Sequence, residues 1–224
     1  MALYLSRIRL NTQRRNTQIA MTSPAKFHGA VEECFGSKGD RKLWRLDTLS
    51  GEYYMLILSP QKPDLSKLRE QFGYPDSTDE IKCYDEFLNS IENDSVWHFR
   101  LVANPTHSIK GSEQARGKVV AHVSEKYQME WLYKKAQKNG FTILTEGSCV
   151  AGSGWKLFRK NNSGKMVRLK EAVFQGILMV DNVELFRKAL VDGIGRGKAY
   201  GMGLLTIVKV REAADGNECR DKES

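Results

Sequence analysis

The first ninety residues alternate between strand-like and helix-like spacing of their apolar side chains. The Ser23-Pro24 pair marks the start of a helix that ends at Gly36, whereas Arg14 and Arg15 are placed in a polar loop. A Ser-Gly pair between two apolar runs predicts a hairpin. Residues 80–91 have helical propensity and are assigned to a strand only by analogy with the second half of the chain. The predicted order is strand, helix, hairpin, helix and strand, at residues 2–10, 23–36, 41–49 with 52–59, 64–72 and 80–91.

The second half of the chain repeats this order. Ser124 is a candidate helix cap, and Asp181 followed by Glu184 predicts a second helix start. The predicted elements are a strand, a short extended segment, a helix, a strand, a hairpin, a helix and a strand, at residues 96–102, 118–122, 124–139, 141–144, 155–160 with 165–176, 181–193 and 204–210. Residues 211–224 hold five acids and three bases without apolar periodicity, and are predicted to be a disordered polar tail.

Strand, helix, hairpin, helix, strand is the order of a ferredoxin-like domain. The sequence therefore predicts an α+β protein with two tandem ferredoxin-like (βαββαβ, RRM-like) domains, at residues 1–93 and 94–210. The boundary is expected near residues 92–96.

The amino-acid composition and net charge argue against a membrane protein and a zinc protein, and favour a protein that binds a polyanion. The chain has 224 residues, of which 28% are charged and 41% hydrophobic, as in a globular protein. No long apolar run or signal segment is visible, so a cytoplasmic protein without a membrane partner is expected. The four cysteines form no C-x-x-C pair and are interpreted as reduced packing thiols, so no zinc site is predicted. The net charge of +8 favours a polyanionic partner.

A basic hairpin is predicted between residues 155 and 170. It contains no acid, and its six cations are Lys156, Arg159, Lys160, Lys165, Arg168 and Lys170. A solvated strand face normally mixes charge signs, so this hairpin is interpreted as a prong for a nucleic-acid groove or backbone. The deep major groove of A-form RNA excludes most side chains, but it opens at the end of a stem. The alternative is a hairpin that is merely soluble.

A glycine-rich loop follows the predicted helix that ends near residue 193. Its glycines are Gly193, Gly195, Gly197, Gly201 and Gly203, with Arg196 and Lys198 between them. Neither G-x-G-x-x-G nor G-x-x-x-x-G-K-[ST] is present, and the loop follows a helix carboxyl end, which repels phosphate. Backbone N–H groups with Arg196 and Lys198 are therefore expected to contact a long, irregular polyanion. The alternative is a flexible loop before an edge strand.

Four histidines are the candidate acid-base groups. His98 and His122 fall in predicted strands, His107 in a loop, and His28 at the edge of the apolar stripe of the first helix. From the sequence alone each is more often a packing or surface residue than a catalytic one. No Ser/His/Asp spacing or H-E-x-x-H motif supports other catalysis, and no metal or cofactor is predicted.

Several motifs together resemble a known family, the CasE endoribonucleases of type I-E CRISPR systems. The resemblance covers residues 2 to about 210 in the right order. It rests on Tyr4-Leu-Ser-Arg-Ile-Arg-Leu-Asn11, Phe27-His28, Leu43-Trp-Arg45, Phe99-Arg-Leu-Val-Ala-Asn-Pro105, Glu130-Trp-Leu132 with Gly140-Phe141, and Gly193 to Leu205.

The resemblance implies metal-independent cleavage of precursor CRISPR RNA at the base of the repeat stem-loop. The 2′-hydroxyl would attack the phosphate, leaving a 2′,3′-cyclic phosphate and a 5′-hydroxyl, with His28 as the proton-transfer group. The family's basic hairpin corresponds to Arg159, Lys160, Lys165 and Arg168. The expected partners are the repeat stem-loop, the mature crRNA that is retained after cutting, and the other Cascade subunits.

One position departs from the family pattern. Several members have a tyrosine three residues before the histidine, and here that position is Ala25. A second acid-base group would be Lys26, Arg41 or Tyr200, unranked, or His28 would act nearly alone with lower activity. The alternative function is a stem-loop-binding subunit that does not cleave. A single-stranded RNA binder of the RRM type is less favoured, because neither half has the aromatic RNP pattern.

Overall fold

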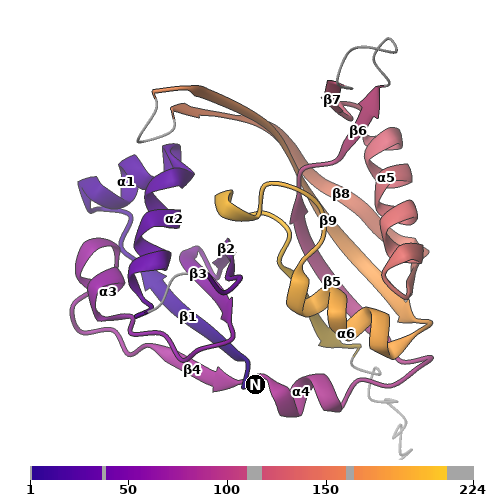
Figure 1. Ribbon diagram of the computed structural model, residues 1–224, viewed down its shortest axis with the longest axis horizontal. Coiled ribbons are helices and arrows are strands. Elements are labelled where there is room, and N and C mark those ends of the chain that lie inside the picture. Colours follow the sequence, from indigo (N-terminus) through magenta and orange to yellow (C-terminus); the bar gives the residue numbers. More distant parts are fainter. Residues whose placement is uncertain (1, 37–38, 110–117, 160–163, 211–224) are drawn as a thin grey trace, which may run out of the picture.

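The computed structural model describes residues 2–36, 39–109, 118–159 and 164–210. The predicted tail at 211–224 lies outside these residues. Two four-stranded antiparallel sheets stand side by side (Figure 1), and a two-stranded hairpin projects from the second.

The first sheet has the strand order β2-β3-β1-β4. Its strands are β1 (Tyr4–Leu10), β2 (Leu43–Leu49), β3 (Glu52–Ser59) and β4 (Glu80–Cys83). The helices of this half are α1 (Arg15–Thr22), α2 (Pro24–Glu33), α3 (Ser66–Phe72) and α4 (Asp85–Asn89). The apolar stripe of α2 packs on the sheet through Phe27, whose ring lies edge-on to Trp44 at a centroid distance of 5.9 Å.

The second sheet has the equivalent order β10-β5-β9-β8. Its elements are β5 (Val96–Ala103), α5 (Glu125–Lys138), β8 (Phe141–Arg159), β9 (Met166–Val180), α6 (Val183–Asp192), the short 3-10 helix η1 (Lys198–Tyr200) and β10 (Leu205–Lys209). An additional hairpin of β6 (Thr106–Ile109) and β7 (Lys118–Ala121) is inserted between β5 and α5. The two strand orders confirm the prediction of two ferredoxin-like units.

One hydrophobic cluster joins the two halves. Leu3, Leu43 and Leu58 of the first half belong to the same buried cluster as Trp97 and Phe174 of the second. Burying this shared apolar surface favours a fixed arrangement of the sheets.

Several local expectations were wrong. Arg15 begins α1 instead of lying in a loop, and this helix buries only Thr17 and Ala20, which is too little to give an apolar stripe. β8 runs unbroken from Phe141 to Arg159, because register shifts after Leu144 interrupt its alternation without ending the strand. Residues 80–91 form a short strand followed by a short helix.

Two predicted helix starts also differ in detail. Asn182 caps α6, because its side-chain oxygen accepts a 3.0 Å hydrogen bond from the Leu185 N–H, whereas Asp181 lies outside the helix. Ser23 and Ser124 stand at the N-cap positions of α2 and α5 but make no side-chain cap hydrogen bond. In the described part of the chain, no helix is long and apolar enough to cross a membrane.

Candidate functional site

The glycine-rich loop is a packed structure and not the flexible loop that was the alternative interpretation of its sequence. All five of its glycines have positive φ angles, between 72° and 93°. The Ile194 N–H donates to the Gly203 carbonyl at 2.8 Å, and the Gly203 N–H donates to the Val102 carbonyl at 2.6 Å. Residues 201–205 are buried. The glycines are needed for close packing in left-handed conformations.

The loop packs against β2 of the first sheet. A Cβ atom on Gly201 would lie 2.8 Å from Cζ3 of Trp44, and one on Gly193 would lie 2.8 Å from Cδ1 of Leu43. These two contacts leave no room for a side chain. The loop therefore ties the second half of the chain to the first.

The helix that carries His28 packs against this loop. Helix α2 contacts η1, which is the Lys198–Tyr200 part of the loop. His28 is half-buried on α2, next to the buried Phe27. Among the described residues it has no hydrogen-bond or ion-pair partner, so its imidazole is available to a ligand.

A positive electrostatic field surrounds the same loop. Burial lowers the pKa of Lys198, repulsion from Arg41 and Lys135 lowers it further, and attraction from Asp192 opposes the shift. Arg41 is exposed, and its repulsion of Lys198 indicates that it lies near η1. Of the other candidates for a second acid-base group, Lys26 is exposed on α2, and the Tyr200 ring is held edge-on to Phe158 at 4.8 Å.

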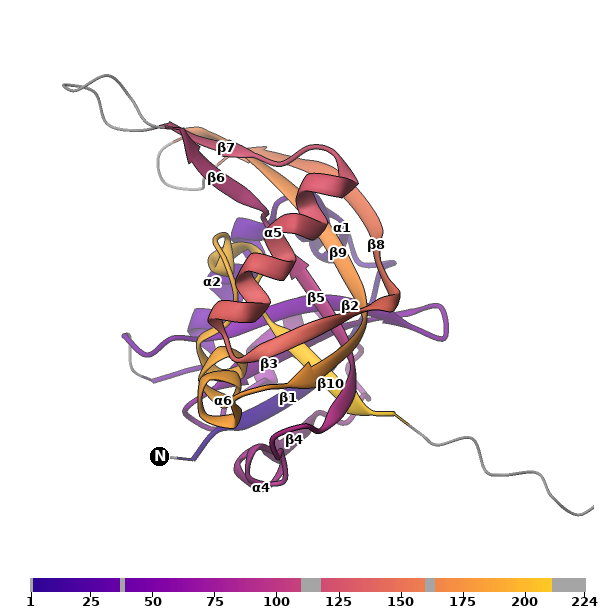
Figure 2. The same cartoon turned by 90° about the vertical axis from the view of Figure 1, so that its right-hand side faces the viewer.

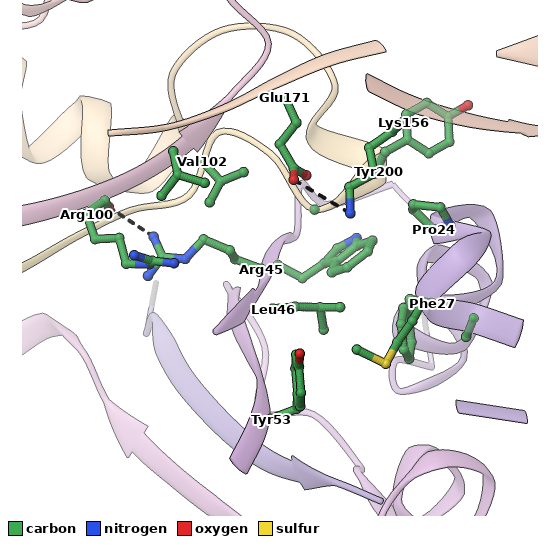
Figure 3. Close-up of a pocket in the computed structure, with 15 residues that line it drawn as sticks. Pro24, Phe27, Arg45, Leu46, Tyr53, Arg100, Val102, Lys156, Glu171 and Tyr200 are labelled. Carbon is green, nitrogen blue, oxygen red and sulfur yellow. Dashed lines mark hydrogen bonds and ion pairs between the residues drawn. The ribbon is translucent and has the colours of Figure 1, made fainter. Parts of the chain in front are cut away.

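A cleft of about 300 Å³ lies between the two sheets (Figure 3). Arg45, Leu46 and Tyr53 line it from the first half, and Lys156 and Glu171 face them from the second. The Nζ atom of Lys156 lies 3.6 Å from Oε1 of Glu171. Lys156 is therefore not an uncompensated cation of the hairpin, because an acid just beyond the stretch considered in the sequence pairs with it.

Arg45 connects the two sheets from within this region. It is 1% exposed and donates to the carbonyls of Arg100 at 2.9 Å and Leu204 at 2.8 Å, and to Thr206 Oγ1 at 2.8 Å. Asp47 neutralises it with an Nη2–Oδ2 distance of 2.5 Å. Burial lowers the pKa of Arg45, while its hydrogen bond to Asp47 opposes the shift.

The basic hairpin and the glycine-rich loop meet in one groove of about 570 Å³, called the basic groove below. Its cations are Lys118, Arg168, Lys170 and Arg196. Trp155 also lines it, and the Arg168 guanidinium carbon lies 4.0 Å above the centre of that indole ring. Asn104 adds a buried side-chain oxygen that has no hydrogen-bond partner among the described residues.

The structure brings together only some of the predicted RNA-binding residues. Arg168 and Arg196 line the basic groove, whereas Arg159 and Lys165 are exposed near the hairpin end and lie outside its lining. Lys160 lies outside the described residues. Trp155, Lys118 and Asn104 were not predicted from the sequence as groove residues. Trp155 could have been predicted, because an aromatic residue among closely spaced cations is typical of nucleic-acid binding.

The described cysteines differ in environment. Cys34 is buried, as a packing thiol should be, but Cys83 and Cys149 are exposed. Cys219 lies outside the described residues. Over the same described ranges, no group of three or more His, Cys, Asp or Glu side chains is arranged to hold a metal ion.

The sequence model of the family described as CRISPR associated protein matches residues 3–209. The chain belongs to this family. A relative from Thermus thermophilus, named CRISPR-associated endoribonuclease Cse3, is 27% identical in an alignment 220 residues long that covers 92% of this chain and 99% of the relative. These matches confirm the resemblance that the sequence motifs indicated.

Solved structures of CRISPR-associated proteins share the fold. Thermus thermophilus Cse3, bound to an RNA representing a pre-cleavage complex, superimposes with a TM-score of 0.79 at 23% identity, covering 93% of this chain and all of that one. A chain of a CRISPR RNA-guided surveillance complex gives a TM-score of 0.69 at 21% identity, covering 92% of this chain and 100% of that one. The two ferredoxin-like units are therefore a shared architecture.

Proposed function

We propose that this member of the CRISPR associated protein family is an endoribonuclease that binds the CRISPR repeat stem-loop and cleaves it at the base of the stem. The observation that carries the proposal is the basic groove, in which the hairpin and the glycine-rich loop meet beside the helix of His28. The relative named as an endoribonuclease supports it.

The groove suits an RNA backbone. Arg168 and Arg196 approach from two separate parts of the chain, so a phosphate strand lying between them would be contacted from both sides. Trp155 already stacks under Arg168, which holds the guanidinium in place without neutralising its charge. Asn104 offers an acceptor to a hydroxyl or amino group of the RNA.

The proposed reaction needs no metal. His28 takes the proton of the 2′-hydroxyl, and the 2′-oxygen bonds to the adjacent phosphorus while the bond to the 5′-oxygen breaks. The leaving 5′-oxygen takes a proton from a second proton-transfer group, giving a 5′-hydroxyl and a 2′,3′-cyclic phosphate. Arg41 and Lys198 supply positive charge beside α2, where negative charge develops on the phosphate.

The second proton-transfer group stays a choice among Lys26, Arg41 and Tyr200. Tyr200 belongs to η1, which contacts α2, and Arg41 acts electrostatically on Lys198 of the same 3-10 helix, whereas Lys26 is exposed on α2. With Ala25 in place of the family tyrosine, slow cleavage is expected.

We further propose that the product hairpin stays bound and that the chain assembles with other Cascade subunits. The likeness to a chain of a surveillance complex supports this assembly. We also propose that the domain boundary lies near residues 92–96, and the end of β4 at Cys83 and the start of β5 at Val96 support this.

The alternative is a subunit that binds the stem-loop without cleaving it, which the departure at Ala25 favours. Incubating the purified chain with its cognate repeat RNA separates the two. Cleavage by the wild-type chain and loss of cleavage, with retained binding, in His28→Ala support the endonuclease. Binding without cleavage by the wild-type chain supports the alternative.

A further inference from the structure

A third cavity, of about 440 Å³, lies between the β6–β7 hairpin and α5. Figure 2 shows this hairpin beside α5. His107 and His122 come from the hairpin and its end, and Tyr127 and Lys134 from the helix. Thr106 lines both this cavity and the basic groove, so the hairpin is a wall common to the two.

Three aromatic rings form a column along this cavity. The centroids of His107 and His122 are 4.4 Å apart with an angle of 32° between the planes, and those of His122 and Tyr127 are 6.1 Å apart at 30°. Tyr127 is 53% exposed, and His107 is also exposed. The column therefore offers ring faces at both ends to a planar ligand.

The column is held in place from beneath by Gln128. This side chain is fully buried, and its Nε2, which carries two N–H donors, lies 3.0 Å from three acceptors, the carbonyl oxygens of His122 and Val123 and Ser153 Oγ. The bonds fix the end of β7 against α5. The rings are thus preorganised, which lowers the entropic cost of binding.

The charge around the column is positive. Lys134, Lys135 and Lys138 line the cavity together with a single acid, Glu130. Burial lowers the pKa of His122, repulsion from His107 and Lys134 lowers it further, and Glu130 opposes the shift. The His122 imidazole is therefore neutral near pH 7 and serves as a stacking surface, while the lysines supply the cations.

We propose that this cavity binds unpaired nucleotides of the RNA whose stem occupies the basic groove. A base stacks on the ring column, and Lys134 and Lys138 contact the phosphates. The proposal rests on the proposed function. Exposed rings with neighbouring cations fit single-stranded nucleic acid, because every base has a π-face and paired bases cannot present it. Because Thr106 lines both sites, a strand that leaves the groove has to pass only this hairpin to reach the cavity.

The test compares RNAs with and without single-stranded flanks. Fluorescence anisotropy at fixed salt measures the Kd of the full chain, in a His28→Ala background, for the repeat stem-loop alone and for the same stem-loop with unpaired nucleotides added on either side. One flank is expected to tighten binding by about tenfold, the order expected for a single stacked base.

Variants of cavity residues test whether the tighter binding of the flanked RNA comes from this cavity. Tyr127→Ala and the double variant Lys134→Ala with Lys138→Ala are expected to lose most of the tenfold gain and to bind the bare stem-loop as the parent does. The matched control is the double variant Lys62→Ala with Lys67→Ala. Both lysines are exposed, Lys67 on α3 and Lys62 just before it, and α3 lies on the opposite side of the molecule from α5 (Figure 1). This control should retain the gain.

The proposal is overturned if neither flank tightens binding, or if the cavity variants retain the gain. It is also overturned if they weaken bare and flanked RNA equally. Loss of assembly with the other complex subunits, with an unchanged flank effect, would assign the cavity to a protein partner instead. Failure of the parent to bind the bare stem-loop would contradict the proposed function itself.

Discussion

The guanidinium of Arg45, on the first sheet, donates a 2.8 Å hydrogen bond to the carbonyl oxygen of Leu204, which lies 159 residues away and directly precedes the last strand. The same side chain also bonds to the Arg100 carbonyl and to Thr206. A buried, directional link of this kind fixes how the two sheets meet, and hence where the glycine-rich loop lies beside α2.

Replacing Arg45 should destabilise the fold strongly. Arg45→Met leaves two buried carbonyl oxygens without this donor and removes a partner of Asp47, so the free energy of unfolding should fall by about 3 kcal/mol or more. Urea denaturation measures it. Arg9→Met is the control, because its pair with Glu52 is about 40% exposed and screened by solvent, so its loss should lower the free energy of unfolding much less. Equal losses in the two variants would contradict the role given to Arg45.

Adding one methyl group at Gly201 should disturb the loop. Gly201 has φ of 80°, and the new Cβ would overlap Trp44, so Gly201→Ala should cost more than about 2 kcal/mol of stability and weaken RNA binding. Gly154→Ala is the matched change, since Gly154 has open space around it, and it should change stability by less than about 0.5 kcal/mol. Thermal unfolding and anisotropy test both, and a Gly201→Ala protein as stable as Gly154→Ala would argue against a packed loop.

The groove residues should dominate RNA affinity. Arg168→Ala and Arg196→Ala should each weaken binding and reduce the slope of log K against log salt by roughly 0.7 to 0.9 per lost phosphate contact. Lys156→Ala should have a smaller effect, because Glu171 already pairs with this lysine. Salt titrations check this order, and a larger effect at Lys156 would place the RNA in the inter-sheet cleft instead.

The cysteines should differ in reactivity. Burial raises the pKa of Cys34 to about 12, with Asp64, Glu33 and Asp79 adding to the shift. A raised thiol pKa keeps the unreactive neutral form through neutral and mildly alkaline pH, so Cys34 should be alkylated only on unfolding. In a Cys219→Ser background, mass spectrometry should find iodoacetamide on Cys83 and Cys149 first. Rapid native labelling of Cys34 would contradict its burial.

The order of elements was predictable because most strands and helices show a clear periodicity of apolar side chains. The elements that were not predicted correctly lack this periodicity. α1 buries two small residues, three of the four residues of β6 are exposed, and bulges hide the continuity of β8. Such elements are held by tertiary contacts and leave little local signal in the sequence.

The site was predictable in its chemistry more than in its geometry. The cations and glycines stand out by composition, but the partners of the glycines, Trp44 and Leu43, lie about 150 residues earlier. The neutralising acid of Lys156 and the burial of Lys170 likewise depend on packing across strands. His28 carries no sequence signal of its own, and its importance rests on the family resemblance and on the contact of α2 with the glycine-rich loop.

The most direct test of the central claim is cleavage of the cognate repeat RNA in EDTA, with end-group analysis and with a matched substrate that carries 2′-deoxyribose at the cut site. The proposed chemistry predicts a 2′,3′-cyclic phosphate and a 5′-hydroxyl from the all-ribose RNA, with the deoxy substrate bound but intact and His28→Ala inactive. Loss of cleavage on chelation, or cleavage of the deoxy substrate, would contradict it.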